Sequence, residues 1–118
     1  MTGGEAAVKS FKKENVKHVF GLIGSATMEM FDALYYEKKI NFIGVRDERT
    51  GTHMADGYAR SSNKPGVIIA GQNGPGATNL VTGVAQAKAA FSPVIALAGS
   101  YSTKDKICLL YTSPSPRD

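Results

Sequence analysis

Glu48 is the residue best placed in this sequence to do chemistry. It follows the mostly apolar run Ile40–Val45, which has the character of a buried strand, and it comes just before a helical segment. A carboxylate at such a point can take up and release a proton as a general acid or base. The alternative is a surface glutamate that stabilises the first turn of the helix through the helix dipole. Taken alone, the residue favours the alternative.

The glycine-rich loop Gly71–Gly76 is a second candidate, because glycines let a ligand approach the backbone closely. Its spacing is not the G-x-G-x-x-G of dinucleotide-binding proteins, and it lacks the Gly-Lys-Ser/Thr ending of a phosphate-binding loop. A nucleotide-binding flavodoxin-like protein is therefore excluded. Taken alone, the loop favours a tight strand-to-helix turn that needs glycine for its geometry.

The other reactive side chains form no recognisable catalytic or metal site. His53 and Met54 fall within a helical segment, where packing is the simpler interpretation, and His18 lies at a strand edge. Two isolated histidines make a poor metal site, so no metal ligands are expected in this chain. Arg46 and Asp47 are interpreted as ion-pairing surface residues.

Composition indicates one globular domain. The chain has 118 residues, of which 42% are hydrophobic, and its net charge of +4 comes from scattered lysines without interleaved aromatic residues. Such lysines are typical of solvated helix faces, so no nucleic-acid partner is expected. No apolar run has membrane-spanning length and no secretory signal opens the chain, so we expect a cytoplasmic protein with no membrane partner.

Helical and extended segments alternate along the chain. The expected helices cover residues 2–13, a segment beginning at Ser25, residues 50–60 and residues 77–91. The expected strands cover residues 18–20, 40–45, 66–70 and 93–98. This alternation predicts an α/β fold in which helices flank a parallel sheet.

Side-chain patterns give more detail on two of these helices. Thr2 and Glu5 are spaced as a capping box that opens the first helix. Ser25 is expected to cap the second helix, on which an apolar stripe is formed by Met28, Phe31, Leu34 and Tyr35.

Ligands of parallel α/β sheets bind beyond the carboxyl ends of the strands. Three loops of this chain meet that criterion, namely Gly21–Ser25, Arg46–Thr50 and Gly71–Gly76. We expect them to line one crevice that contains both Glu48 and the glycine-rich loop.

Taken together, these loops and their flanks resemble the N-terminal pyrimidine-binding domain of thiamine diphosphate-dependent enzymes, within the acetolactate synthase-like group. The resemblance spans about residues 4–100 and rests on Val19–Ser25, Val45–Glu48, His53–Arg60, Lys64–Val67 and Gly74–Asn79. Each stretch alone is a weak signal, whereas their order and spacing together are specific. The resemblance implies the flavodoxin-like thiamine diphosphate-binding fold, truncated at its C-terminal side.

The resemblance also reverses the interpretation of Glu48. In this family the equivalent glutamate hydrogen-bonds N1′ of the aminopyrimidine, which favours the imino tautomer and so activates the cofactor. Glu48 is thus implied to be catalytic and to bind thiamine diphosphate.

Five further residues are implied to bind the cofactor. Gly24 and Ser25 match the loop near its reacting end, whereas Pro75, Gly76 and Asn79 match the segment beside the pyrimidine ring. For Asn79 an alternative is that the side chain only caps or orients its own helix.

The implied activity is that of a carboligase or decarboxylase acting on a 2-oxo acid or a related carbonyl compound. Its Mg²⁺ would be bound by a Gly-Asp-Gly motif and a later Asn in a domain that this chain lacks, and an FAD-binding middle domain stays open. The family assembles active sites between subunits, so a homodimer or homotetramer is implied and this chain alone is expected to be inactive. A non-catalytic cofactor-binding or regulatory domain of the same fold is the alternative.

The sequence departs from the family pattern at two places. Asp47 stands where a histidine usually precedes the catalytic glutamate, and Ile23-Gly24-Ser25 replaces the usual Pro-Gly-Gly. The second departure, together with Gln72–Gly76, is similar to sulfoacetaldehyde acetyltransferases. Both leave the substrate open.

The last eleven residues have a different character. Residues 108–118, which include the single Cys108, resemble the translation of a common sequencing adapter. We therefore expect residues 1–107 to form an incomplete N-terminal domain and residues 108–118 not to be native.

Overall fold

The computed structural model describes residues 1–100, which alternate between helices and strands as expected. The helices are α1 (Gly3–Lys13), a short 3₁₀ turn (Ser25–Thr27), α2 (Met28–Tyr36), α3 (Glu48–Ser62) and α4 (Pro75–Ala89). The strands are β1 (His18–Gly21), β2 (Asn41–Gly44), β3 (Gly66–Ile69) and β4 (Val94–Leu97). Within residues 1–100 there is no helix of the length and apolarity that a bilayer crossing requires. The predicted tail at 108–118 lies outside the described residues and stays a prediction.

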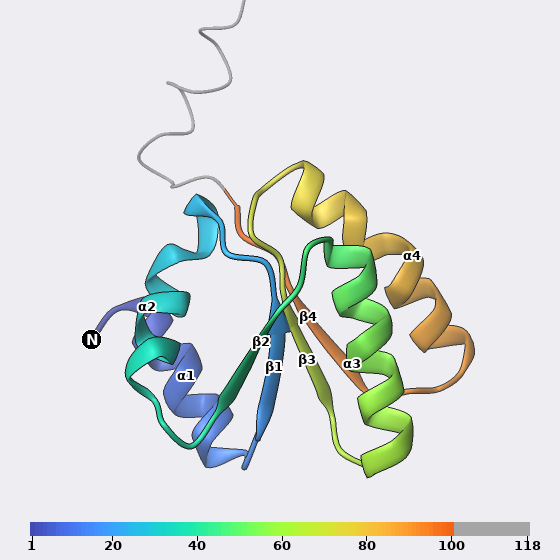
Figure 1. The fold of residues 1–118 in the computed structure, drawn as a ribbon, viewed down its shortest axis with the longest axis horizontal. Coiled ribbons are helices and arrows are strands. Elements are labelled where there is room, and N and C mark those ends of the chain that lie inside the picture. Colours follow the sequence, from blue (N-terminus) through green and yellow to red (C-terminus); the bar gives the residue numbers. More distant parts are fainter. Residues whose placement is uncertain (101–118) are drawn as a thin grey trace, which may run out of the picture.

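The strands form one parallel sheet in the order β2-β1-β3-β4. Figure 1 shows α1 and α2 on one side of this sheet and α3 and α4 on the other, with all carboxyl strand ends pointing to the top of the view. The predicted α/β class and the flavodoxin-like arrangement are thus confirmed. The chain runs from β1 outward to β2 at one edge and then crosses back to β3 on the other side of β1. The direction of the strand order therefore reverses between β1 and β3, and ligands of such sheets bind at this point.

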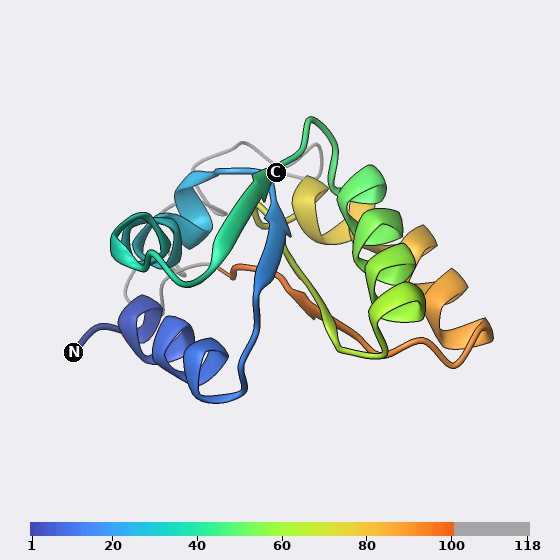
Figure 2. The ribbon, with the colours of Figure 1, turned by 60° about the horizontal axis from the view of Figure 1, so that its bottom comes forward.

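Two apolar clusters hold the layers together. One lies under α1 and α2 and is built from Val8, Phe11, Val19, Phe31, Leu34, Ile40, Val67 and Ile69. The other lies under α3 and α4 and contains Phe20, Ala55, Ile68, Ala70 and Leu80. Successive residues of β1 and β3 enter opposite clusters because side chains alternate along a strand. The two central strands therefore bury both faces, and Figure 2 shows both helical layers against them.

The apolar stripe expected on α2 is wrong in two of its four members. Phe31 and Leu34 are buried, but Met28 and Tyr35 are 52% and 72% exposed. The buried face also includes Met30 and Ala33, which pack against the first cluster. The helix is therefore rotated toward α1, its neighbour on the same side of the sheet, which helical periodicity alone does not locate.

Strand β2 is not buried on both faces, contrary to expectation. Asn41 and Gly44 are exposed, and Phe42 and Ile43 are only partly buried. The reason is the strand order, which places β2 at an edge with β1 as its single partner in the described sheet.

Candidate functional site

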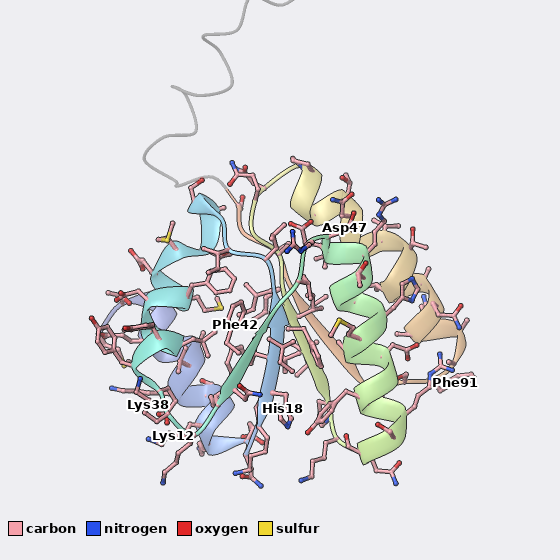
Figure 3. All side chains as sticks on the ribbon, viewed as in Figure 1. Lys12, His18, Lys38, Phe42, Asp47 and Phe91 are labelled. Carbon is pink, nitrogen blue, oxygen red and sulfur yellow. The ribbon has the colours of Figure 1, made fainter. Side chains whose placement is uncertain are left out.

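Glu48 is buried at the carboxyl end of the sheet. It is the first residue of α3, which starts where the chain leaves β2, and only 4% of it is exposed. Asp47 precedes it as the N-cap, and Figure 3 shows Asp47 at the top of α3. Burial of a carboxylate requires hydrogen-bonding partners, because an unpaired buried charge is costly.

Both carboxylate oxygens of Glu48 have such a partner. Oε1 accepts a hydrogen bond from the Gly71 backbone N–H at 3.3 Å, and Oε2 accepts one from the Asn79 side-chain amide at 3.1 Å. These donors come from the loop after β3 and the second turn of α4, so the Glu48 side chain links α3 to both. A carboxylate has about four acceptor positions, which leaves Glu48 capacity for a further donor.

Glycine lets the backbone approach this carboxylate. A Cβ built on Gly76 would lie 3.0 Å from Oε1 of Glu48, closer than such atoms normally come. Gly74, the N-cap of α4, has φ +67° and ψ −101°, a conformation that side chains disfavour. The glycines of this loop therefore serve both the turn and the close approach to Glu48.

The loops after β1 and β3 touch each other at the reversal point of the sheet. A Cβ on Gly24 would collide with the Gly71 carbonyl. The Ser25 hydroxyl donates to Oε1 of Gln72 at 2.8 Å, and the buried Thr27 hydroxyl donates to the Ala70 carbonyl at 2.9 Å. These contacts hold the loops after β1 and β3 together.

Ser25 is not the cap of α2, contrary to expectation. Gly24 is the N-cap of the 3₁₀ turn and Thr27 the N-cap of α2, and neither makes a side-chain capping bond. The Ser25 hydroxyl donates to Gln72 in the loop after β3 instead, because that side chain lies within reach.

The predicted site residues fall into two groups. Glu48, Gly76 and Asn79 meet at one point, with Asn79 contacting the carboxylate rather than only its own helix. Gly24 and Ser25 lie on the opposing loop, and Pro75 is an exposed first residue of α4. The structure thus brings the loops together, while the cofactor-binding roles stay predictions.

Asp47 has a local structural role. Its side chain accepts from the Arg49 backbone N–H at 2.8 Å, and its carboxylate pairs with the Arg49 guanidinium at 2.8 Å. These bonds to Arg49 lower the pKa of Asp47 from 3.8 to about 2. The expected ion pair at the surface is present, with Arg49 rather than Arg46 as the cation.

The His53 and Met54 side chains do not pack against the core of the described residues, contrary to expectation. His53 is exposed and Met54 is 38% exposed. The inward face of α3 carries smaller residues, including Gly51, Thr52 and Ala55, because the helix lies close to β3 and α4.

Three contacts at the site were not predicted from the sequence, although Gly71 and Gln72 belong to the glycine-rich loop expected there. Gly71 donates to Glu48, Gln72 pairs with Ser25, and the buried Thr52 hydroxyl donates to the Glu48 carbonyl at 2.7 Å. The i, i+4 spacing of Glu48 and Thr52 could have indicated the last of these. The first two depend on how loops from different strands meet.

The Glu48 carboxylate can accept a further hydrogen bond. It lies against the backbone of the glycine-rich loop at Gly71 and Gly76 and has spare acceptor capacity, so a ring N–H could bond it. A proton shared across that bond would couple the carboxylate to the electrons of the ring.

Comparison with known proteins gives consistent matches. Residues 1–107 match the family model described as thiamine pyrophosphate enzyme, N-terminal TPP binding domain. Over 104 residues, 88% of this chain, it is 48% identical to a probable acetolactate synthase large subunit of Methanococcus aeolicus. Over 102 residues, 86% of this chain, it is 42% identical to a mitochondrial acetolactate synthase catalytic subunit of Aspergillus candidus. These matches cover 17% and 15% of the two relatives, so the chain spans a small part of their length.

Proposed function

The chain belongs to the thiamine pyrophosphate enzymes, as their N-terminal TPP-binding domain, and from this premise we propose that Glu48 activates the cofactor for carboligation or decarboxylation of a 2-oxo acid. The proposed reaction is of the acetolactate synthase type, a transferase or lyase activity. The relatives named above support this class, since both carry acetolactate synthase names.

The observation that carries the proposal is the state of the Glu48 carboxylate. It is 4% exposed, and its two bonds from Gly71 and Asn79 fix both oxygens. N1′ of an aminopyrimidine is a hydrogen-bond acceptor, so it fits the O–H of a protonated Glu48 carboxyl group, and once the proton has moved to the ring the carboxylate accepts from N1′–H. The residues present therefore fit the pyrimidine half of the cofactor.

We assign a role to each site residue from its position. When bound, thiamine diphosphate supplies a carbon nucleophile that attacks the carbonyl carbon of the substrate. Glu48 shares a proton with N1′, and Asn79 and Gly71 orient its carboxylate. Gly76 lets the ring approach, while Gly24 and Ser25 form the opposing wall. Pro75 sets the first turn of α4, which carries Asn79.

The remaining properties of the whole enzyme are proposed from the family. Mg²⁺ and the diphosphate would be held outside this chain, by a domain of a partner subunit in a homodimer or homotetramer. Figure 3 shows Phe91 standing off the end of α4, and its 95% exposure supports a further covering element there. A cytoplasmic location, the identity of the 2-oxo acid and any FAD belong to the same proposal.

The decisive experiment replaces Glu48→Gln in the complete natural protein. Turnover of a panel of 2-oxo acids should fall by about 10²–10⁴-fold, the usual contribution of a general acid–base group. The secondary structure should stay intact, because glutamine keeps the shape: its amide oxygen can accept from Gly71, and its NH2 group can donate to the Asn79 side-chain oxygen once that amide has flipped. The matched control is Glu14→Gln, an exposed site at the end of α1, which should leave turnover unchanged.

The same experiment tests the alternative of a non-catalytic domain. If Glu48→Gln and Glu14→Gln have equal turnover, the catalytic role is wrong. A protein with no turnover but with cofactor binding that depends on Glu48 would instead support a binding or regulatory domain.

A further inference from the structure

A pocket lies on the side of the sheet away from Glu48. It has a volume of about 700 Å³ and is lined by α2, by the loop from α2 to β2, and by the start of β2. Figure 3 shows Phe42 between α2 and β2, with Lys38 near the turn that joins them. The volume is within the range of about 300–1,000 Å³ that small-molecule sites occupy.

The wall of this pocket is apolar. Phe31 and Leu34 contribute from α2, and Ile40 and Phe42 contribute from the β2 segment. The rings of Phe31 and Phe42 meet edge to face with their centroids 5.2 Å apart. Such a wall favours the apolar body of a ligand over water.

The rim of the pocket is cationic. Lys17, Lys38 and Lys39 line it, and within residues 1–100 none of the three makes an ion pair. The acidic residue of the rim, Glu37, is engaged by Lys12 at 2.9 Å. Its pKa is lowered, chiefly by that bond to Lys12.

The rim therefore carries three lysines against one carboxylate, since Glu37 is shared between Lys12 and Lys39, whose backbone N–H donates to it at 3.0 Å. Lys38 is held in place, since its Nζ donates to the Tyr35 carbonyl at 3.2 Å and lies 5.2 Å from the centre of the Tyr35 ring. An ammonium group has three donors, so Lys38 keeps two for a ligand.

From the apolar wall beside a rim in which lysines outnumber carboxylates, we propose that this pocket binds a small amphipathic anion, an apolar chain or ring that bears one carboxylate or phosphate. The apolar body lies against Leu34 and Phe42, and the head group contacts the lysines. Ile23, which precedes Gly24 in the loop after β1, lines the same pocket. This site is separate from Glu48, and its occupation does not depend on the proposed catalytic function.

The test measures binding rather than turnover. Octanoate, octyl phosphate and neutral 1-octanol are titrated by calorimetry into the complete natural protein and into the triple variant Lys17→Gln, Lys38→Gln, Lys39→Gln. The anions should bind saturably to the natural protein, and their affinity should fall at least about tenfold in the variant, because charge-assisted hydrogen bonds are lost. The affinity of 1-octanol should not change. A tighter octanoate identifies a carboxylate site, and a tighter octyl phosphate a phosphate site.

A matched triple variant controls for net charge. Lys9→Gln, Lys13→Gln and Lys64→Gln remove the same charge from exposed positions that do not line this pocket, and should leave anion affinity unchanged. The proposal is overturned if no anion binds saturably, if both triple variants weaken binding equally, or if 1-octanol binds as tightly as octanoate. Methyl NMR supplies a second test, since perturbations should centre on Leu34 and Ile40; perturbations confined to the exposed Val81 and Val84 of α4 would place the ligand elsewhere and overturn it.

Discussion

The two sides of the sheet are built on different principles. The α1–α2 side buries a hydrophobic cluster and one polar residue, Thr27 at the start of α2. The side under α3 and α4 buries three polar residues of one helix, Glu48, Thr52 and Asp56. Apolar packing tolerates many sequences of similar volume, whereas each buried polar group needs a particular partner.

This contrast separates apolar packing from buried polar contacts within one small domain. The α1–α2 side is mainly apolar, and its pocket is open at a rim of exposed lysines. The α3–α4 side holds a carboxylate between donors from the loop after β3 and from α4. Substitutions on the first side should therefore change stability, and substitutions on the second should also change the Glu48 site.

The largest effect on stability is expected from Leu34→Ala, which removes a buried side chain from the α1–α2 cluster. The free energy of unfolding should fall by about 3 kcal/mol, as for other large-to-small core changes. Denaturant unfolding measures it, with the neighbouring exposed Tyr35→Ala as a control within about 0.5 kcal/mol. If a folded Leu34→Ala protein lost cofactor activation, the Glu48 site would depend on packing at the α1–α2 side, contrary to the contrast between the two sides.

A smaller effect is expected from Gly83→Ala in α4. The new Cβ would lie 2.5 Å from Cβ and Cγ2 of Thr52, so α4 must move away from α3. Overpacking should lower the free energy of unfolding by about 1–2 kcal/mol and displace Asn79 from Glu48.

The control for that change is Gly57→Ala in α3, where nothing lies within 4 Å of the new Cβ. It should stabilise the helix by about 0.5–1 kcal/mol. Equal unfolding midpoints for the two variants would contradict the close approach of α3 and α4.

The ion pair between Asp56 and Arg60 should contribute less. Asp56 is buried and bonds the Arg60 guanidinium, and this bond is the main reason that its pKa is lowered. A lowered folded pKa stabilises the protein above the unfolded pKa, and the contribution is lost as pH falls through the folded pKa. Arg60→Gln should lower the free energy of unfolding only slightly at neutral pH, since the arginine is 46% exposed and its charge is screened by solvent.

The pH dependence identifies the cause of that loss. The difference between natural protein and Arg60→Gln should shrink below the ordinary Asp pKa of 3.8, as Asp56 becomes protonated. A difference that stays constant down to the lowest pH at which the protein folds would assign the loss to packing instead.

The smallest effect concerns Asp47, at the exposed end of α3. NMR titration of its carboxyl group should give a pKa of about 2, and Arg49→Gln should move it back toward 3.8. Turnover should not change, because the Asp47 carboxylate is bonded to Arg49 and makes no hydrogen bond with the Glu48 side chain. A loss of turnover in Arg49→Gln would show that the position before Glu48 takes part in the chemistry.

The sequence predicted the elements because their hydrophobic periods are strong. Every expected helix and strand is present, and the burial of β3 follows from its run Val67-Ile68-Ile69. Glu48 was placed correctly at a helix start beyond a strand, since a parallel sheet collects such loops at one edge. Local pattern and topology were sufficient for these features.

The predictions that were wrong concern features that depend on contacts between distant segments. The rotation of α2 is set by α1, and the exposure of β2 by a strand order that no local pattern encodes. Ser25 satisfies its hydroxyl on Gln72, 47 residues along the chain, rather than on its own helix. The bond from Asn79 to Glu48 spans 31 residues and likewise needed the packed helices to be seen.

The central claim is that Glu48 activates thiamine diphosphate. Hydrogen–deuterium exchange at C2 of the thiazolium ring, the carbon that becomes the nucleophile, tests it most directly. The exchange rate is measured in the complete natural protein and in Glu48→Gln at matched cofactor occupancy. Exchange should be at least about 10²-fold slower in the variant, because the carboxylate that shares the N1′ proton is gone. Equal rates at equal occupancy would contradict it.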